Sequence, residues 1–248
     1  MQILSVGNSF SCDAHTYLYR ISHAEKNDLS TVNLSIGGCT LERHYRNMLG
    51  DSRDYSLQVG GLSSGFPMSI KEALLSRPWD VITIQQASHV SFDFSTYTPY
   101  LEALVDYFRH MCPHAKIYLQ ETWGYETGSP RIEHYGFRTM EEMSGKIFSA
   151  YAKAAQTVHA DGIIPSGHGM LALSKAQPSP VHRDTFHAGL GAPRYMIGCI
   201  WYETLTGKPV TRTDFSDFDV EVTPEEAALA REVAHKTVVE FMRHRNSK

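Results

Sequence analysis

Residues 2–11 read QILSVGNSFS, a short apolar run that leads through a tight turn into a helical pattern. The apolar residues at 3–6 predict a buried strand, and the apolar residues between 14 and 24 recur at the spacing of one helix face. A serine at this junction, Ser9, is carried to the carboxyl edge of a sheet, beside the unpaired N–H groups of a helix N-terminus. A nucleophile and an oxyanion site need these two features. A plain connecting turn would have the same Gly-Asn-Ser sequence.

The rest of the chain alternates between strand and helix patterns. Four more segments predict buried strands, at 30–36, 79–84, 116–119 and 162–165. The helical patterns between and after them begin at about residue 41 and cover 68–77, 101–111, 139–159, 193–205 and 224–242, with a brief helical turn at 170–173. The polar, glycine-rich residues 50–65 indicate a surface loop or hairpin, and 124–137 and 175–190 indicate polar loops.

This alternation predicts an α/β fold. We expect a three-layer α/β/α sandwich with a flavodoxin-like, doubly wound sheet of five parallel strands. No linker, composition shift or repeat divides the chain, so residues 1–248 are expected to form one domain. Ligands of such sheets bind outside the carboxyl ends of the strands. The residues that directly follow each strand are therefore the candidates for chemistry.

The net charge limits the kinds of partner that the protein can bind, and the cysteine spacing indicates its compartment. The net charge of −4 gives no basic field for nucleic acid or an anionic membrane surface, and no apolar run approaches the ~20 residues of a membrane helix. No signal-peptide pattern is visible, and the four cysteines show no Cys-x-x-Cys spacing. We therefore expect free thiols and a cytoplasmic protein. Nothing in the sequence indicates an oligomeric state.

The late polar loop contains a second candidate, Asp184-Thr185-Phe186-His187. An aspartate three residues before a histidine can reach the imidazole Nδ1–H, which leaves Nε2 facing outward as a general base. Asp-x-x-His pairs are also frequent by chance in a chain with thirteen histidines, and a solvated loop would explain this one equally well.

Taken together and in order, these segments resemble the SGNH hydrolase superfamily, also called GDSL-type esterases. The first block, Gly-Asp-Ser in that family, is Gly7-Asn8-Ser9 here, and the last block, Asp-x-x-His, ends at His187. The glycine of the second block matches Gly38, with Gly37 as the alternative. The run from His187 to Gly207 is similar to a poorly characterised bacterial branch of the superfamily.

The third block departs from the family pattern. Where the superfamily usually has Gly-x-Asn-Asp, this chain has Gln85-Gln86-Ala87-Ser88. A glutamine offers the same NH2 donor as an asparagine, on a side chain longer by one methylene. Neighbouring strand positions point to opposite faces, so only one of the two glutamines is expected to reach the site.

The resemblance implies a role for each matched residue. Ser9 would be the nucleophile, His187 the general base and acid, and Asp184 the group that orients His187. The oxyanion would be held by the backbone N–H groups of Ser9 and Gly38 and by the amide of Gln86, with Gln85 as second choice.

The implied reaction is two-step acyl transfer on a carboxylic ester, without a metal or organic cofactor. The expected substrate is a small ester, such as an O-acetylated sugar, from which the enzyme removes a short acyl group. Gln85 and Trp123, which follow the third and fourth predicted strands, are candidates for lining the substrate pocket.

Two other functions fit parts of the sequence. A catalytically inactive carbohydrate- or small-molecule-binding protein could use the same fold, because fold does not fix function. A metal-dependent hydrolase could use His182 and His187 with Asp184 between them and His168 upstream, although no HExxH motif or Cys/His cluster is present.

Overall fold

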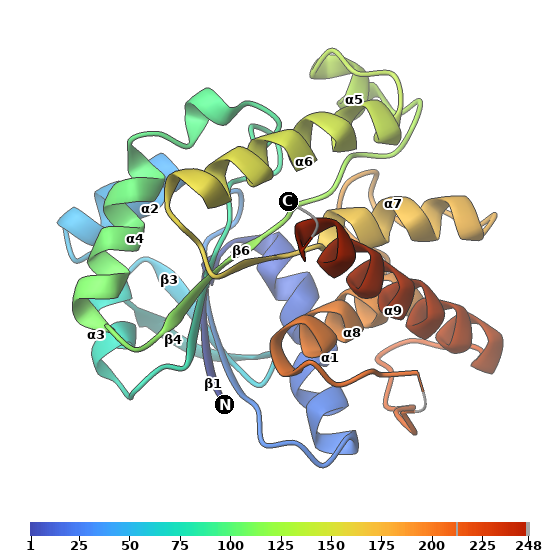
Figure 1. Cartoon of the computed structure of the whole chain (residues 1–248), viewed down its shortest axis with the longest axis horizontal. Coiled ribbons are helices and arrows are strands. Elements are labelled where there is room, and N and C mark those ends of the chain that lie inside the picture. The colour runs from blue at the N-terminus through green and yellow to red at the C-terminus, as the bar shows by residue number, and fades with distance from the viewer. Residues whose placement is uncertain (212, 247–248) are drawn as a thin grey trace.

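The computed structural model describes residues 1–211 and 213–246. They form one seven-stranded sheet with helices packed on both faces (Figure 1). The strand order is β4-β3-β2-β1-β5-β6-β7. The strands are β1 (Gln2–Gly7), β2 (Ser30–Ser35), β3 (Tyr55–Val59), β4 (Leu62–Met68), β5 (Val81–Ile84), β6 (Lys116–Gln120) and β7 (Gly162–Ile164).

Five of these strands are parallel, as predicted, and run in the order β2-β1-β5-β6-β7. Strand β1 is central: Ile3 lies opposite Thr31 on one side and Val81 on the other. Its residues from Ile3 to Gly7 are all buried, because helices cover both faces of a parallel sheet.

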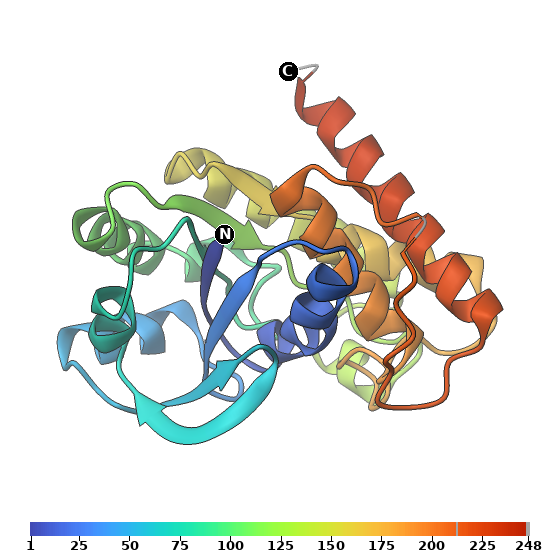
Figure 2. The same cartoon turned by 90° about the horizontal axis from the view of Figure 1, so that it is seen from below.

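The hairpin β3–β4 corrects the expected strand count from five to seven. Residues 55–68 form a hairpin, one of the two predicted alternatives, and it pairs antiparallel with β2, so it extends the sheet at one edge. Figure 2 shows this hairpin, in cyan, at the border of the sheet. Its tight turn uses Gly60 and Gly61, both at positive φ. A Cβ on Gly61 would lie 2.6 Å from the His15 carbonyl oxygen, so the close approach requires glycine there.

Helices form the two outer layers. On one face α1 and α8 pack against each other, with α9 packed on α8, and α2, α3, α4 and α6 lie on the opposite face (Figure 1). The helices are α1 (Ser9–Ala24), α2 (Leu41–Leu49), α3 (Ile70–Leu75), α4 (Tyr100–Met111), α5 (Pro130–His134), α6 (Met140–Thr157), α7 (Ser166–Ala176), α8 (Ala192–Thr206) and α9 (Pro224–Asn246), with a short 3-10 helix η1 (Phe94–Thr96).

Three of these elements differ from the expected ones. Helix α3 starts at Ile70 because Met68 ends β4 and Ser69 caps the helix with a capping box. Helix α7 has 11 residues where a brief turn was predicted, and the short α5 lies inside the expected polar loop. Within the described ranges, no helix combines the length and apolar character needed to cross a membrane.

The strand order fixes where a ligand can bind. The chain passes from β1 outward to β2 and later returns to β5 on the other side of β1, so the winding direction reverses between β1 and β5. In doubly wound sheets this reversal opens a crevice at the carboxyl ends of the two strands. Ser9 follows β1 and Gln85 follows β5, so both lie at this point.

Candidate active site

The turn between β1 and α1 presents Ser9. Asn8 is the N-cap of α1, and its Oδ1 accepts a hydrogen bond from the Phe10 N–H at 3.0 Å. Ser9 is the first helical residue, so its own N–H has no acceptor within the helix and stays available at the positive end of the helix dipole. Gly7 is required just before, because a Cβ there would lie 2.6 Å from the Ser11 hydroxyl.

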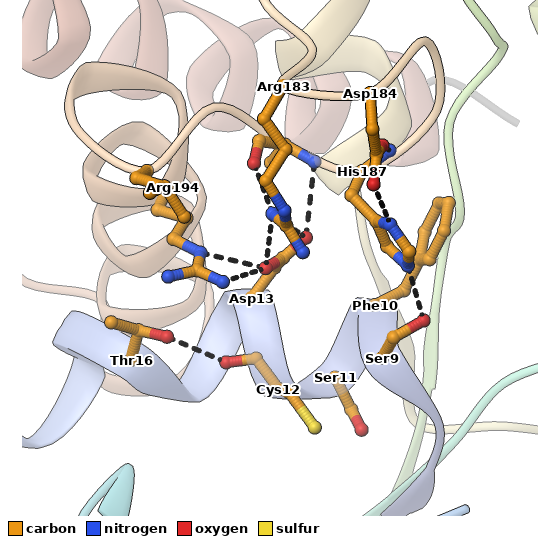
Figure 3. A network of polar contacts seen from close by, with 12 residues as sticks. Ser9, Phe10, Ser11, Cys12, Asp13, Thr16, Arg183, Asp184, His187 and Arg194 are labelled. Carbon is orange, nitrogen blue, oxygen red and sulfur yellow. Dashed lines mark hydrogen bonds and ion pairs between the residues drawn. The ribbon is translucent and has the colours of Figure 1, made fainter. Parts of the chain in front are cut away.

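Ser9, His187 and Asp184 form one line of hydrogen bonds. Ser9 Oγ lies 2.8 Å from His187 Nε2, and His187 Nδ1 lies 2.7 Å from Asp184 Oδ2 (Figure 3). Partial burial acts to raise the pKa of Asp184, but the hydrogen bonds from the ring and backbone N–H of His187 outweigh it and hold this pKa below its ordinary value. The ionised carboxylate therefore favours the Nδ1–H tautomer of His187, which leaves Nε2 as the acceptor for the serine proton.

The loop that carries His187 is closed by a backbone bridge between its two ends and is held by a contact with Trp123. An antiparallel bridge joins His182 and Ala188, and Thr185 adopts a positive φ of 73°. The indole N–H of Trp123 donates to the Phe186 carbonyl at 2.8 Å, and its ring stacks on Phe10 with centroids 4.0 Å apart.

Trp123 therefore corrects a sequence-based expectation. Its side chain is fully buried, so it supports the His187 loop and does not line an open substrate pocket in this structure. Gln85, the other expected pocket residue, is 2% exposed and equally closed to solvent.

Asp13 is a part of the site that the sequence reasoning missed. This carboxylate, with no exposed surface, bonds Arg183, Arg194 and the Ala188 N–H (Figure 3). It lies on the buried side of α1 between Phe10 and Tyr17. A charged residue on a predicted core face is a readable signal, because buried charges are nearly always paired.

The turn after β2 is hydrogen-bonded to the turn that carries Ser9. The Asn8 Nδ2 donates to the Cys39 carbonyl at 3.2 Å, which holds the segment that contains Gly38 against the start of α1. Gly38 has a φ of +63°, which glycine adopts without strain.

The two glutamines after β5 have structural partners. Gln86 Nε2 donates to the carbonyl and the hydroxyl of Thr96, and its Oε1 accepts from the N–H groups of Leu41 and Ala87. These contacts do not support Gln86 as the oxyanion donor, because its amide donates to Thr96 in this structure. Gln85 Nε2 donates to Asn8 Oδ1 at 2.5 Å, so Gln85 stabilises the N-cap of α1.

The histidines considered as metal ligands have separate partners. His182 Nε2 bonds the Gly124 carbonyl, and burial lowers the pKa of His182 to about 4. His168 Nδ1 bonds the buried carboxylate of Glu121 at 2.8 Å. Burial acts to lower the pKa of His168, but Glu121 outweighs it and raises this pKa above its ordinary value. In the described part of the chain, no three His, Cys, Asp or Glu side chains are grouped so as to hold a metal ion.

Comparison with known proteins agrees with this architecture. The family described as "Domain of unknown function (DUF4886)" matches residues 2–237. The solved structure of a DUF4886 family protein from Bacteroides uniformis is 31% identical in sequence, with a TM-score of 0.88 over 96% of this chain and 95% of that chain. No curated protein is similar enough to the chain to count as a match.

Two more distant structures share the fold. A candidate SGNH hydrolase from Slackia heliotrinireducens is 21% identical, with a TM-score of 0.60 over 83% of this chain and 98% of that chain. A candidate GDSL-like lipase from Parabacteroides merdae is 18% identical, with a TM-score of 0.54 over 82% and 94% of the two chains. The three-layer fold of SGNH hydrolases is therefore the fold of this chain.

Proposed function

The chain belongs to the DUF4886 family, and we propose that it is a serine esterase of the SGNH type. The observation that carries the proposal is the continuous hydrogen-bonded line from Ser9 Oγ through His187 to Asp184. It lies at the carboxyl edge of the sheet beside a helix N-terminus, where a nucleophile and an oxyanion site can be combined.

Each step of the reaction follows from these positions. His187 Nε2 takes the proton of Ser9 as Oγ attacks the ester carbonyl carbon, and Asp184 stabilises the imidazolium that forms. The tetrahedral oxyanion is held by the free N–H of Ser9, together with the N–H of Gly38 across the crevice. His187 then gives the proton to the leaving alcohol, and water releases the acyl group from Ser9 by the same steps in reverse.

A short acyl group on a polar alcohol, such as an acetylated sugar, suits the surroundings of Ser9. Phe10 and Trp123 are packed against each other beneath His187, with no exposed ring face to receive a long acyl chain. A cavity of about 820 Å³ lies between α6, α7 and α9, and Ser9 and His187 are not among the residues that line it. Ser9 is half-buried and lies beside polar loops, where a hydrophilic alcohol can approach.

Hydrolysis of p-nitrophenyl acetate and butyrate tests the proposal. The wild type should turn over acetate faster than butyrate, and Ser9→Ala and His187→Ala should each lower kcat by at least about 10³-fold. The exposed Ser149→Ala is a matched control and should keep wild-type activity. Intact-mass analysis after a fluorophosphonate probe should show one adduct, mapped to Ser9.

Two results would contradict the proposal: an unlabelled Ser9, or activity unchanged by both substitutions. An unlabelled Ser9 in a protein without ester turnover would favour a non-catalytic binding protein on the same fold. Activity unchanged by both substitutions would place the reaction at other residues. Acetate release from a peracetylated sugar, measured in parallel, tests whether the enzyme accepts esters of a polar alcohol.

A further inference from the structure

The carboxylate of Asp13 is the most heavily bonded side chain near the site. Its Oδ1 lies 2.7 Å from Arg194 Nε and 3.0 Å from Arg183 Nη1, and its Oδ2 accepts from the Ala188 N–H at 3.1 Å. Asp13 has no exposed surface, whereas the two arginine side chains are 17% and 27% exposed. The pairs are thus largely sheltered from water and from salt screening.

These partners flank the Asp-x-x-His segment on both sides. Arg183 directly precedes Asp184, and Ala188 directly follows His187. Arg183 also bonds the Ala188 carbonyl, which closes the two flanks on each other. Asp13 therefore holds both ends of the four-residue turn, and it does so from α1, the helix that begins with Ser9 one turn earlier (Figure 3).

The hydrogen bond between Asp184 and His187 cannot hold the loop against α1. Both residues lie in the same turn, so their bond orients the ring within the loop but does not fix the loop relative to Ser9. The Asp184 side chain is also 44% exposed. The Trp123 hydrogen bond ties the loop to the segment after β6, and Trp123 reaches α1 only through the stacking of its ring on Phe10.

We infer that Asp13 is a positioning residue that sets the separation of His187 Nε2 and Ser9 Oγ by fixing the loop to the nucleophile helix. The inference rests on the proposed esterase function. A displacement of the base by about 1 Å can cost on the order of 10²-fold in rate, so a contact far from the reacting atoms can control kcat.

The variant Asp13→Asn keeps the shape of the side chain and removes its charge. We expect kcat for p-nitrophenyl acetate to fall about 10- to 100-fold with KM changed less than about threefold, because the base is displaced and the substrate surface is not. The matched control is Glu203→Gln, a carboxylate 6% exposed that bonds His235 between α8 and α9. This control should lose stability and keep wild-type kcat below its melting temperature.

A double substitution separates positioning from a general structural role. Labelling of Ser9 by the fluorophosphonate should slow in Asp13→Asn, but Asp13→Asn should cause no further slowing in a His187→Ala background. Wild-type kcat in Asp13→Asn, or equal slowing of labelling in both backgrounds, would overturn the inference.

Hydrogen–deuterium exchange supplies a readout that does not depend on activity. In Asp13→Asn, exchange should rise in residues 181–189 and stay unchanged in β1 and β5. Unchanged exchange in 181–189 would also overturn the inference. Failure of the proposed function is distinct, because the wild type itself would then show no ester turnover and no label on Ser9.

Discussion

Ser9 and Asp13 lie one helical turn apart on α1, and both bond the loop that begins at Val181. Ser9 meets the ring of His187, and Asp13 meets the backbone of Ala188, the next residue. One rigid helix thus carries both the Ser9 hydroxyl and the side chain that anchors the His187 loop. Helix geometry keeps these two points at a fixed spacing, so the loop is held at a fixed position relative to Ser9.

Asp184→Asn should lower kcat strongly while leaving the fold intact. The amide has no charge to stabilise the imidazolium, and it can favour the wrong tautomer of His187, for which losses of about 10⁴-fold are known in buried triads. Because Asp184 is 44% exposed, we expect a smaller loss, about 10²- to 10³-fold. Steady-state kinetics with p-nitrophenyl acetate measures it. Asp217→Asn, which removes an exposed ion pair with Arg20, is the control, and a loss below threefold in Asp184→Asn would argue against its role.

Gln86→Ala should reduce stability and leave catalysis nearly unchanged. The substitution removes the acceptor of the Leu41 and Ala87 N–H groups, and each unsatisfied buried donor costs about 1–3 kcal/mol. A lost oxyanion donor would lower kcat by about 10²- to 10³-fold, whereas we expect less than about fivefold. Urea unfolding and kinetics on the folded variant measure the two effects. A hundredfold loss of kcat would restore Gln86 as an oxyanion donor.

Asn8→Asp should destabilise the protein, although aspartate is the usual residue in the Gly-Asp-Ser block. Asn8 Nδ2 donates to the Cys39 carbonyl, and a carboxylate would place two acceptors against each other there. The lost bond costs about 1–3 kcal/mol, and a negative charge at the helix N-terminus returns about 0.3–1 kcal/mol. The free energy of unfolding in urea should therefore fall by about 1–2 kcal/mol. A gain in stability would show that the Cys39 contact is unimportant.

The free energy of unfolding should already fall at pH values well above those at which carboxylates titrate. Burial lowers the pKa of His15 and His44 to about 3, and that of His182 to about 4. The unfolded chain binds protons at these sites below about pH 6.5 and the folded chain does not, so stability is lost as the pH falls through this range. Each site contributes a slope of about 1.4 kcal/mol per pH unit.

Urea unfolding between pH 6.5 and 5 measures this slope. His15→Gln should lower the slope by the contribution of one site, about 1.4 kcal/mol per pH unit, because one fewer proton is taken up on unfolding. The variant should also be less stable overall. The exposed His23→Gln serves as the control and should keep the wild-type slope. An unchanged slope in His15→Gln would show that His15 is not buried and neutral in the folded state.

The layered fold could be predicted because its signals are local. Apolar runs such as 3–6 and 81–84 are short, continuous and bounded by turns, which is typical of parallel strands covered on both faces. The hairpin at 55–68 was not assigned to the sheet, since Tyr55 is its one buried residue and its pairing with β2 depends on tertiary contact. Helix α7 was underestimated because its glycines, Gly167 and Gly169, lower helix propensity while packing requires them.

The site residues also fall into those that local sequence signals identify and those that depend on tertiary contacts. Ser9, Asp184 and His187 follow from their positions after strands and from short spacings, so the sequence identifies all three as candidates. The roles of Gln85, Gln86 and Trp123 could not be inferred, because each depends on which buried partner lies within hydrogen-bond distance. Asp13 was overlooked for the same reason: its partners are 170 or more positions away in the chain.

The order of the segments has a consequence for biosynthesis. Ser9 and His187 are separated by 178 positions, and Arg194, which also bonds Asp13, comes later still. A chain made from its N-terminus thus completes the serine turn and most of the sheet long before the base is synthesised. The proposed esterase activity should appear only after the segment beyond residue 181 docks on α1, so Ser9 of the nascent chain should stay inert until that segment has folded.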